Sequence, residues 1–152
     1  MNNRRSFIVG IKSTKLSYKE KIYLKKYKPW GVILFSRNIK NIKQSLKLTS
    51  SIRKIFNDHK YPILIDQEGG RVNRLKNIIS FDNLTSEFFG KKYINNYKEF
   101  KFIYKLFIDK TAYLLKSIGA NINTVPVLDL RVKGASKIIG DRSFSKDPNI
   151  AS

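Results

Sequence analysis

Two acidic and two basic side chains lie close together in the segment LIDQEGGRVNRL, residues 64–75. Asp66 and Glu68 precede a pair of glycines, and Arg71 and Arg74 follow it. Ionised carboxylates accept hydrogen bonds from neighbouring hydroxyl groups, and a planar guanidinium can hold a carboxylate, an amide oxygen or a hydroxyl. Together these groups predict a pocket for a sugar or another polyol.

Each of these residues also has a purely structural interpretation. Asp66 could pair with an arginine only to stabilise a turn, and Glu68 could accept hydrogen bonds from backbone amides. Gly69 and Gly70 could serve only to let the chain turn sharply. The residue types alone leave both interpretations open.

Polar residues also follow two other apolar segments. Arg37 and Asn38 come after WGVILF (30–35), and Asp129, Asp141 and Arg142 come after NINTVPVLDL (121–130). Asp129 could instead cap a loop, and Asp141 and Arg142 could form a single ion pair. The carboxyl ends of parallel strands share one edge of a sheet, where α/β folds bind ligands. We therefore expect the three polar groups to lie on one face.

Strands and helices alternate along the chain. The apolar runs predict strands at 6–11, 30–35, 61–65 and 121–130, and the capping residues and apolar periodicity predict helices at 17–28, 41–56 and 98–117, a short helix at 85–89 and a helix starting near Pro148. In the helix at 98–117, the predicted apolar face consists of Phe102, Ile103, Leu106, Phe107 and Leu114. Four such strand-helix repeats indicate a parallel sheet. We predict an α/β fold in which the chain supplies about the first half of a (β/α)8 TIM-type barrel.

The composition allows one compact hydrophobic core, and we expect residues 1–152 to form the N-terminal part of a single barrel domain whose remainder is absent. The chain has 152 residues, of which 41% are hydrophobic, and contains no cysteine, so disulfides and thiolate metal sites are excluded. The apolar run Phe7 to Ile11 is too short for the core of a signal peptide, and no stretch approaches the roughly 20 apolar residues that span a bilayer. We expect a cytoplasmic protein that does not engage a membrane.

A net charge of +20 raises the alternative of a nucleic-acid-binding protein. The lysines are spread over the predicted helices, whereas residues 61–75 and 117–132 contain none and are each balanced in charge. A solvated basic surface is the interpretation we favour, and nucleic acid is not expected as the main partner.

Four motifs in this order resemble those of bacterial β-N-acetylhexosaminidases of glycoside hydrolase family 3. They are WGVILFSRNI (30–39), LIDQEGGRVNRL (64–75), VPVLDL (125–130) and IGDRSFSKDP (139–148), and the resemblance runs from about Phe7 to the last residue. It implies a TIM-type barrel that removes terminal N-acetylglucosamine, typically from muropeptides during cell wall recycling. It also implies a retaining mechanism without metal or organic cofactor.

The resemblance assigns roles to individual residues. Asp66 matches the aspartate that binds the sugar hydroxyls, Arg74 the arginine eight residues later, and Arg142 the arginine of the IGDRSF motif. Glu68 and Arg71 are expected to support the loop. Asp129 and Asp141 complete the set of supporting candidates.

No catalytic residue is assigned in this chain. In the family, a KHFPGHG-like segment, the histidine acid/base and the nucleophilic aspartate follow the region that the chain matches. We therefore expect the chain to hold part of the sugar site without a complete catalytic pair, and to be inactive by itself. Two alternatives remain: a non-catalytic basic module for nucleic acid or an anionic glycan, and one half of a split enzyme.

Overall fold

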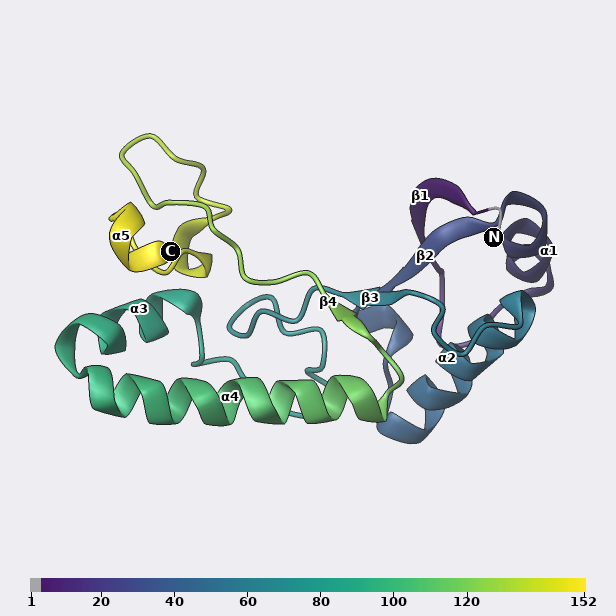
Figure 1. Ribbon diagram of the computed structural model, residues 1–152, viewed down its shortest axis with the longest axis horizontal. Coiled ribbons are helices and arrows are strands. Elements are labelled where there is room, and N and C mark those ends of the chain that lie inside the picture. The colour runs from purple at the N-terminus through teal and green to yellow at the C-terminus, as the bar shows by residue number, and fades with distance from the viewer. Residues whose placement is uncertain (1–3) are drawn as a thin grey trace.

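Four parallel strands form the central sheet. The computed structural model describes residues 4–152. The strands are β1 (Arg5–Gly10), β2 (Pro29–Leu34), β3 (Ile63–Ile65) and β4 (Ile122–Asn123), and they pair in the order β1-β2-β3-β4. Neighbouring strands in sequence are therefore neighbours in the sheet, which confirms the predicted parallel arrangement (Figure 1).

Helices connect the strands, and a last short helix follows the fourth strand. They are α1 (Tyr18–Tyr27), α2 (Ile42–Phe56), α3 (Ser86–Asn95), α4 (Tyr97–Ser117) and α5 (Pro148–Ala151), with 3-10 turns η1 (Ser36–Asn38) and η2 (Gly140–Arg142). The predicted caps are confirmed: Ser17 and Glu20 form a capping box on α1, Asn41 caps α2, and Asp147 precedes Pro148 at the start of α5.

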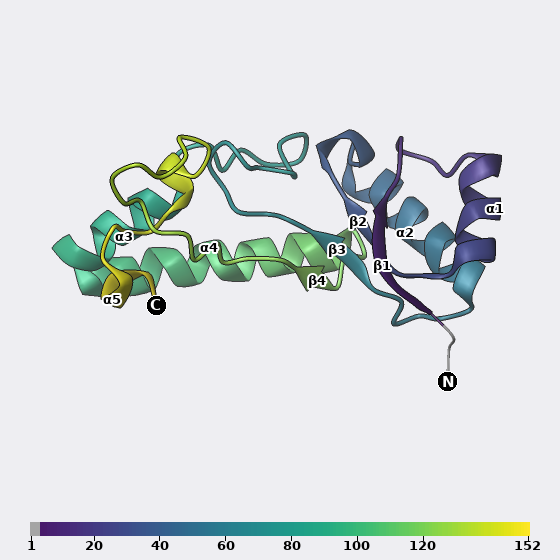
Figure 2. The same cartoon turned by 90° about the horizontal axis from the view of Figure 1, so that it is seen from above.

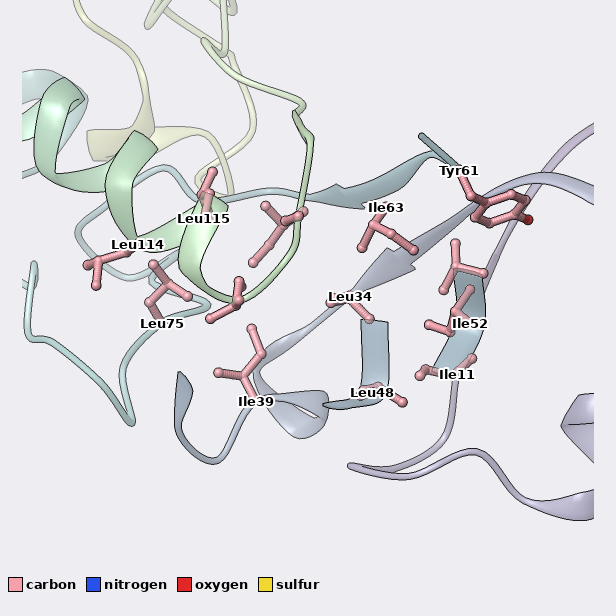
Figure 3. Close-up of a cluster of buried hydrophobic side chains, with 14 of the residues drawn as sticks. Ile11, Leu34, Ile39, Leu48, Ile52, Tyr61, Ile63, Leu75, Leu114 and Leu115 are labelled. Carbon is pink, nitrogen blue, oxygen red and sulfur yellow. The ribbon is translucent and has the colours of Figure 1, made fainter. Parts of the chain in front are cut away.

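The core lies between the sheet and the helices α2 and α4. Leu34 and Ile63 point from the strands toward Leu48 and Ile52 of α2, and all four are almost completely buried (Figure 3). The same cluster continues to Leu75, Leu114 and Leu115 beside α4. Because these side chains are buried together, they determine which face of each strand packs against the helices.

Two side chains of α2 hold the end of α4. The hydroxyl of Thr49 donates to the carbonyl oxygen of Ile118 at 3.0 Å, and Arg53 donates to the carbonyl oxygen of Gly119 at 2.7 Å. Gly119 has a φ of +79°, and a Cβ there would lie 2.3 Å from the Thr49 hydroxyl oxygen. Its predicted place just beyond the helix is confirmed, and the close approach to α2 requires glycine.

The fourth strand is much shorter than predicted. We predicted that residues 121–130 form a strand and the segment that leaves it, but only Ile122–Asn123 pair with β3. Pro126 has no N–H to donate to a neighbouring strand, and residues 124–132 run as an extended segment along the molecule. Asp129 consequently lies on a loop.

Two predictions about helices were wrong in part. The short helix expected at 85–89 extends over Ser86–Asn95. On α4, Phe102 and Leu106 are 66% and 53% exposed, and the buried face consists of Phe107, Thr111, Leu114 and Leu115. The predicted stripe was therefore rotated by about one residue, because α3 and the loop after β3 cover the side of α4 on which Phe107 lies.

The molecule is elongated, with the sheet, α1 and α2 at one end and α3, α5 and the end of the chain at the other (Figures 1 and 2). Helix α4 runs between these two regions, and the loops that follow β3 and β4 lie alongside it. Within residues 4–152, no helix has the length and apolar character needed to cross a bilayer.

Candidate functional site

The carboxyl ends of β2, β3 and β4 bring three side chains to one face of the sheet. Pairing aligns Ile33 with Leu64, and Leu64 with Ile122. Side chains on a strand alternate between faces. The residues two positions further on, Phe35, Asp66 and Thr124, therefore follow on that same face, away from the helix-covered core.

Asp66 contacts residues from two loops. Its Oδ1 accepts a hydrogen bond from the hydroxyl of Thr124, and its Oδ2 lies 3.6 Å from Nη2 of Arg74. The Asp66 and Arg74 side chains are 27% and 28% exposed. Both are therefore held by protein contacts and still reachable from solvent, as a ligand-binding pair must be.

An aromatic ring lies next to the arginines of this edge. The guanidinium carbons of Arg37 and Arg74 lie 4.5 Å and 5.4 Å from the centre of the Phe35 ring, within the range of cation–π attraction. Arg37 also donates from Nε to the carbonyl oxygen of Ile11 at 3.0 Å. The Phe35 ring thus restricts where Arg74 can lie. The sequence predicts Phe35 only as the last residue of an apolar strand.

Asn38 has a structural role. It is completely buried, its Nδ2 donates to the carbonyl oxygens of Ile11 and Ser13, and its Oδ1 accepts from the N–H of Phe35. These three bonds attach the loop after β1 to the end of β2. The polar residue predicted at this strand exit therefore positions the backbone.

The loop after β3 turns at its two glycines. Gly69 and Gly70 have φ angles of +97° and +54°, and a Cβ on Gly69 would lie 2.3 Å from the carbonyl oxygen of Leu84. The turn brings Val72 back to Glu68, where the Glu68 N–H donates to the Val72 carbonyl at 3.2 Å. Because a side chain at Gly69 would clash with backbone, glycine is needed here for the shape of the site.

Gln67 is buried and holds the loop after β3 in place by hydrogen bonds. It is 1% exposed, its Oε1 accepts from the N–H of Leu75, and its backbone exchanges hydrogen bonds with the side chain of Asn123. Sequence reasoning missed this residue. The available signal was the alternation of β3, which places Gln67 on the same buried side as Ile63 and Ile65.

Arg142 is bound to Glu68. Its Nε and Nη2 each donate to a different carboxylate oxygen at 2.8 Å, and the Glu68 side chain is only 7% exposed. This hydrogen bonding to Glu68 raises the pKa of Arg142, as do the nearby charges of Asp129 and Asp66, against the opposing effect of burial. Asp129, Asp66 and Arg142 thus share one electrostatic environment.

Arg71 forms a second link between the loop after β3 and the loop after β4. Its Nε lies 2.8 Å from Oδ1 of Asp141, and its Nη2 donates to the carbonyl oxygens of Ile138 and Ile139. The alternative in which Asp141 pairs with Arg142 is wrong, because each of these residues pairs with the loop after β3. The alternative in which Glu68 serves backbone amides is also wrong, since its carboxylate holds Arg142.

The strand ends thus form a row of groups suited to hydroxyl-rich ligands. Carboxylate and guanidinium groups of Asp66, Arg74 and Arg142 lie near one another, supported by Glu68 and Arg71. His59 is exposed and precedes β3, at the opposite edge of the sheet. Among the described residues, no three His, Asp or Glu side chains gather closely enough to hold a metal ion.

The chain is similar to a known protein family and to several known relatives. Residues 7–152 match the N-terminal domain of glycosyl hydrolase family 3. A β-hexosaminidase from Hydrogenovibrio crunogenus is 37% identical over 143 residues, covering 94% of this chain and 39% of the relative. A β-hexosaminidase from Xanthomonas euvesicatoria pv. vesicatoria is 32% identical over 146 residues, covering 94% of this chain and 42% of the relative.

Solved structures show the same fold. NagZ from Neisseria gonorrhoeae superimposes with a TM-score of 0.77 and 27% identity, covering 97% of this chain and 43% of that one. The same protein in complex with N-trifluoroacetyl-D-glucosamine gives a TM-score of 0.74. The sheet is therefore part of a TIM-barrel-type α/β fold, and the chain spans less than half the length of the relatives it matches.

Proposed function

The chain belongs to glycosyl hydrolase family 3, and from its site geometry we propose that it forms the sugar-binding part of a β-N-acetylhexosaminidase. The substrate is a β-N-acetylglucosaminide with the sugar at its non-reducing end. A muropeptide is the specific substrate we favour, with cell wall recycling in the cytoplasm as the setting. The likeness to a NagZ that binds an N-acetylglucosamine analogue supports the sugar assignment.

The observation that carries the proposal is the grouping of Asp66, Arg74 and Arg142 at one edge of the sheet. A carboxylate accepts hydrogen bonds from two adjacent hydroxyls, and the two guanidiniums donate to hydroxyl or amide oxygens. Asp66 is already partly neutralised by Arg74, so sugar hydroxyls can join this pair without leaving a buried charge unpaired.

In this proposal the cluster binds and orients the sugar, and other parts of the enzyme break the glycosidic bond. Retaining glycosidases use an acid/base group and a nucleophile on opposite sides of the bond. Asp66 is held by Thr124 and Arg74 in the manner of a binding residue. Residues 1–152 then act as part of a single hydrolase barrel, and the 152-residue chain by itself binds weakly without turnover.

A chimera tests the proposal. This chain would replace the matching part of Neisseria gonorrhoeae NagZ, and hydrolysis of 4-nitrophenyl N-acetyl-β-glucosaminide would be measured. We expect turnover by the chimera and none by the chain alone. In the chimera, Asp66→Ala should lower kcat/KM by about 10- to 100-fold, as expected for losing hydrogen bonds to a charged group.

The matched control is Asp82→Ala in the same chimera, since Asp82 is exposed on the loop between β3 and α3. Its kcat/KM should stay within about twofold of the parent. A folded chimera that hydrolyses the substrate equally well with and without Asp66 would overturn the role proposed for the cluster. Folding would be verified by circular dichroism and a cooperative thermal transition.

A further inference from the structure

A long groove runs between α1 and α2, separate from the strand-end cluster. Two cavities of about 510 Å³ and 470 Å³ lie along it and share Lys21 and Ser51 as lining residues. The two helices lie beside each other at the end of the molecule remote from α3 and α5 (Figures 1 and 2). None of the lining residues belongs to the sugar-binding cluster.

The rims of this groove are basic. Six lysines line the two cavities: Lys15, Lys21, Lys25, Lys43, Lys47 and Lys54. Among the described residues that line them, none is acidic. The one acid of α1, Glu20, accepts hydrogen bonds from Ser17 and from the Lys12 N–H at the helix start, and α2 contains no acid. The positive charge here is therefore not compensated locally.

The floor of the groove contains aliphatic side chains together with the uncharged polar residues Thr14, Asn41, Gln44 and Ser51. Leu16, Ile22, Leu48 and Ile55 line it, and Ile22 is 47% exposed. Helix α1 contributes only Leu24 to the buried core, so it packs loosely and leaves space between itself and α2. The lysine-rich surface is therefore recessed between the two helices, and Ile22 with the half-buried Leu16 and Ile55 presents aliphatic surface to solvent within the recess.

We propose that this groove binds an acidic amphipathic helix from a protein partner. Leucine-like side chains of the partner would contact the aliphatic residues of the floor, while its carboxylates would face the lysines on both rims. The segment of α2 from Lys43 to Ile55 spans about 20 Å at 1.5 Å per residue, which is enough to hold a helix of three to four turns.

Single-stranded nucleic acid fits the groove less well. Proteins that bind it combine basic side chains with several aromatic rings on which bases stack. Tyr18 is the one aromatic residue lining the two cavities among the described residues, and it is 78% exposed at one end. The other lining residues are lysines, aliphatic residues and uncharged polar residues, which offer no ring for a base to stack on.

A peptide-binding experiment on the full chain tests the proposal. The probe is a fluorescent peptide of about 14 residues in which leucines recur at i, i+3, i+4 and i+7 and the other positions are glutamate. Its affinity would be measured by anisotropy and compared with a scrambled peptide of the same composition and with a 14-nucleotide oligothymidine. We expect the amphipathic peptide to bind at least about tenfold tighter than either.

Variants of the groove residues test whether the peptide binds in the groove. Lys21→Glu with Lys47→Glu should weaken binding at least about tenfold, and Ile22→Ser should weaken it severalfold. The matched control, Lys98→Glu with Lys110→Glu, changes the same charge at exposed positions on α4 and should leave binding within twofold. Equal binding of the scrambled peptide or of oligothymidine, or equal loss in the control, would overturn the proposal.

Discussion

The guanidinium of Arg142 donates two parallel hydrogen bonds of 2.8 Å to the two carboxylate oxygens of Glu68. The residues are 74 positions apart in sequence, and the Glu68 side chain is almost completely buried. A bidentate pair fixes the plane of the guanidinium as well as its position. The loop that follows β3 therefore positions an arginine carried by the loop that follows β4.

Glu68→Gln should loosen Arg142 without removing it. The amide keeps the size of the side chain, but its NH₂ group would face a guanidinium N–H, so one hydrogen bond and the charge attraction are lost. We expect the free energy of unfolding to fall by about 1–3 kcal/mol. Hydrogen exchange should become faster in residues 131–147, and sugar binding should weaken about tenfold in the chimera.

Asp141→Asn provides the comparison. The Arg71–Asp141 pair has side chains that are 46% and 36% exposed, so water screens it and its loss should cost at most about 1 kcal/mol. Arg71 also keeps its bonds to the carbonyl oxygens of Ile138 and Ile139. A larger loss for Asp141→Asn than for Glu68→Gln would contradict the ranking of the two pairs.

Thr124→Val should affect sugar binding more than stability. Thr124 is exposed, and its hydroxyl donates to Oδ1 of Asp66. Valine keeps the shape but leaves Asp66 oriented by Arg74 alone. We expect the unfolding free energy to change by less than about 1 kcal/mol, and KM of the chimera to rise severalfold with little change in kcat. An unchanged KM would mean that this hydroxyl does not orient Asp66 for the ligand.

The sheet could be predicted from sequence because its strands are continuous apolar runs that end abruptly in polar residues. WGVILF and YPILI carry this signal clearly, and both strands were found within one or two residues. β4 could not be bounded in this way, since NINTVPVLDL stays apolar well beyond the two residues that pair. Pairing depends on the neighbouring strand, which local sequence does not describe.

The sequence predicts which residues belong to the candidate site, but it predicts only some of the contacts between them. Residue types and order identified Asp66, Arg74 and Arg142, but the choice of partners depends on loops that meet only in the folded chain. Asp141 and Arg142 are adjacent, yet each pairs with the loop after β3. Phe35 and Gln67 were missed because each also has a partner far away in the sequence: Phe35 lies beside Arg74, and the backbone of Gln67 exchanges hydrogen bonds with the side chain of Asn123.

Gly90→Ala should disturb the loop that carries Arg142. A Cβ on Gly90, in the middle of α3, would lie 1.8 Å from the backbone carbonyl oxygen of Phe144. Alanine favours a helix over glycine by about 1 kcal/mol, but this clash with backbone cannot be relieved by a side-chain rotation. We expect a net loss of about 1–3 kcal/mol in unfolding free energy, measured by urea denaturation.

Lys91→Ala is the matched control on the same helix. Lys91 is exposed and forms an i,i+4 ion pair with Glu87, so its removal should cost less than about 0.5 kcal/mol. Gly90→Ala should also speed proteolysis between residues 131 and 147, whereas Lys91→Ala should not. A stabilised Gly90→Ala protein would show that the contact between α3 and Phe144 does not form.

Glu20 should make the stability of α1 depend on pH. Partial burial opposes ionisation of Glu20, but hydrogen bonds from the Lys12 N–H and from Ser17, with the charge of Lys12, lower its pKa below the ordinary value of 4.5. A pKa that is lower in the folded than in the unfolded chain means that ionised Glu20 favours folding. Its contribution is present above about pH 4.5 and is lost as pH falls through the lower folded value.

Glu20→Gln removes this dependence while keeping a side chain that can cap the helix. At pH 7 the variant should be less stable by about 0.5–1 kcal/mol, the scale of one capping interaction. The difference from the parent should shrink steadily as the pH falls below 4.5, as measured by urea denaturation at each pH. Since the carboxylate is protonated in both states at low pH, a difference that stayed constant from pH 7 to pH 3 would mean that charge on Glu20 contributes nothing to the cap.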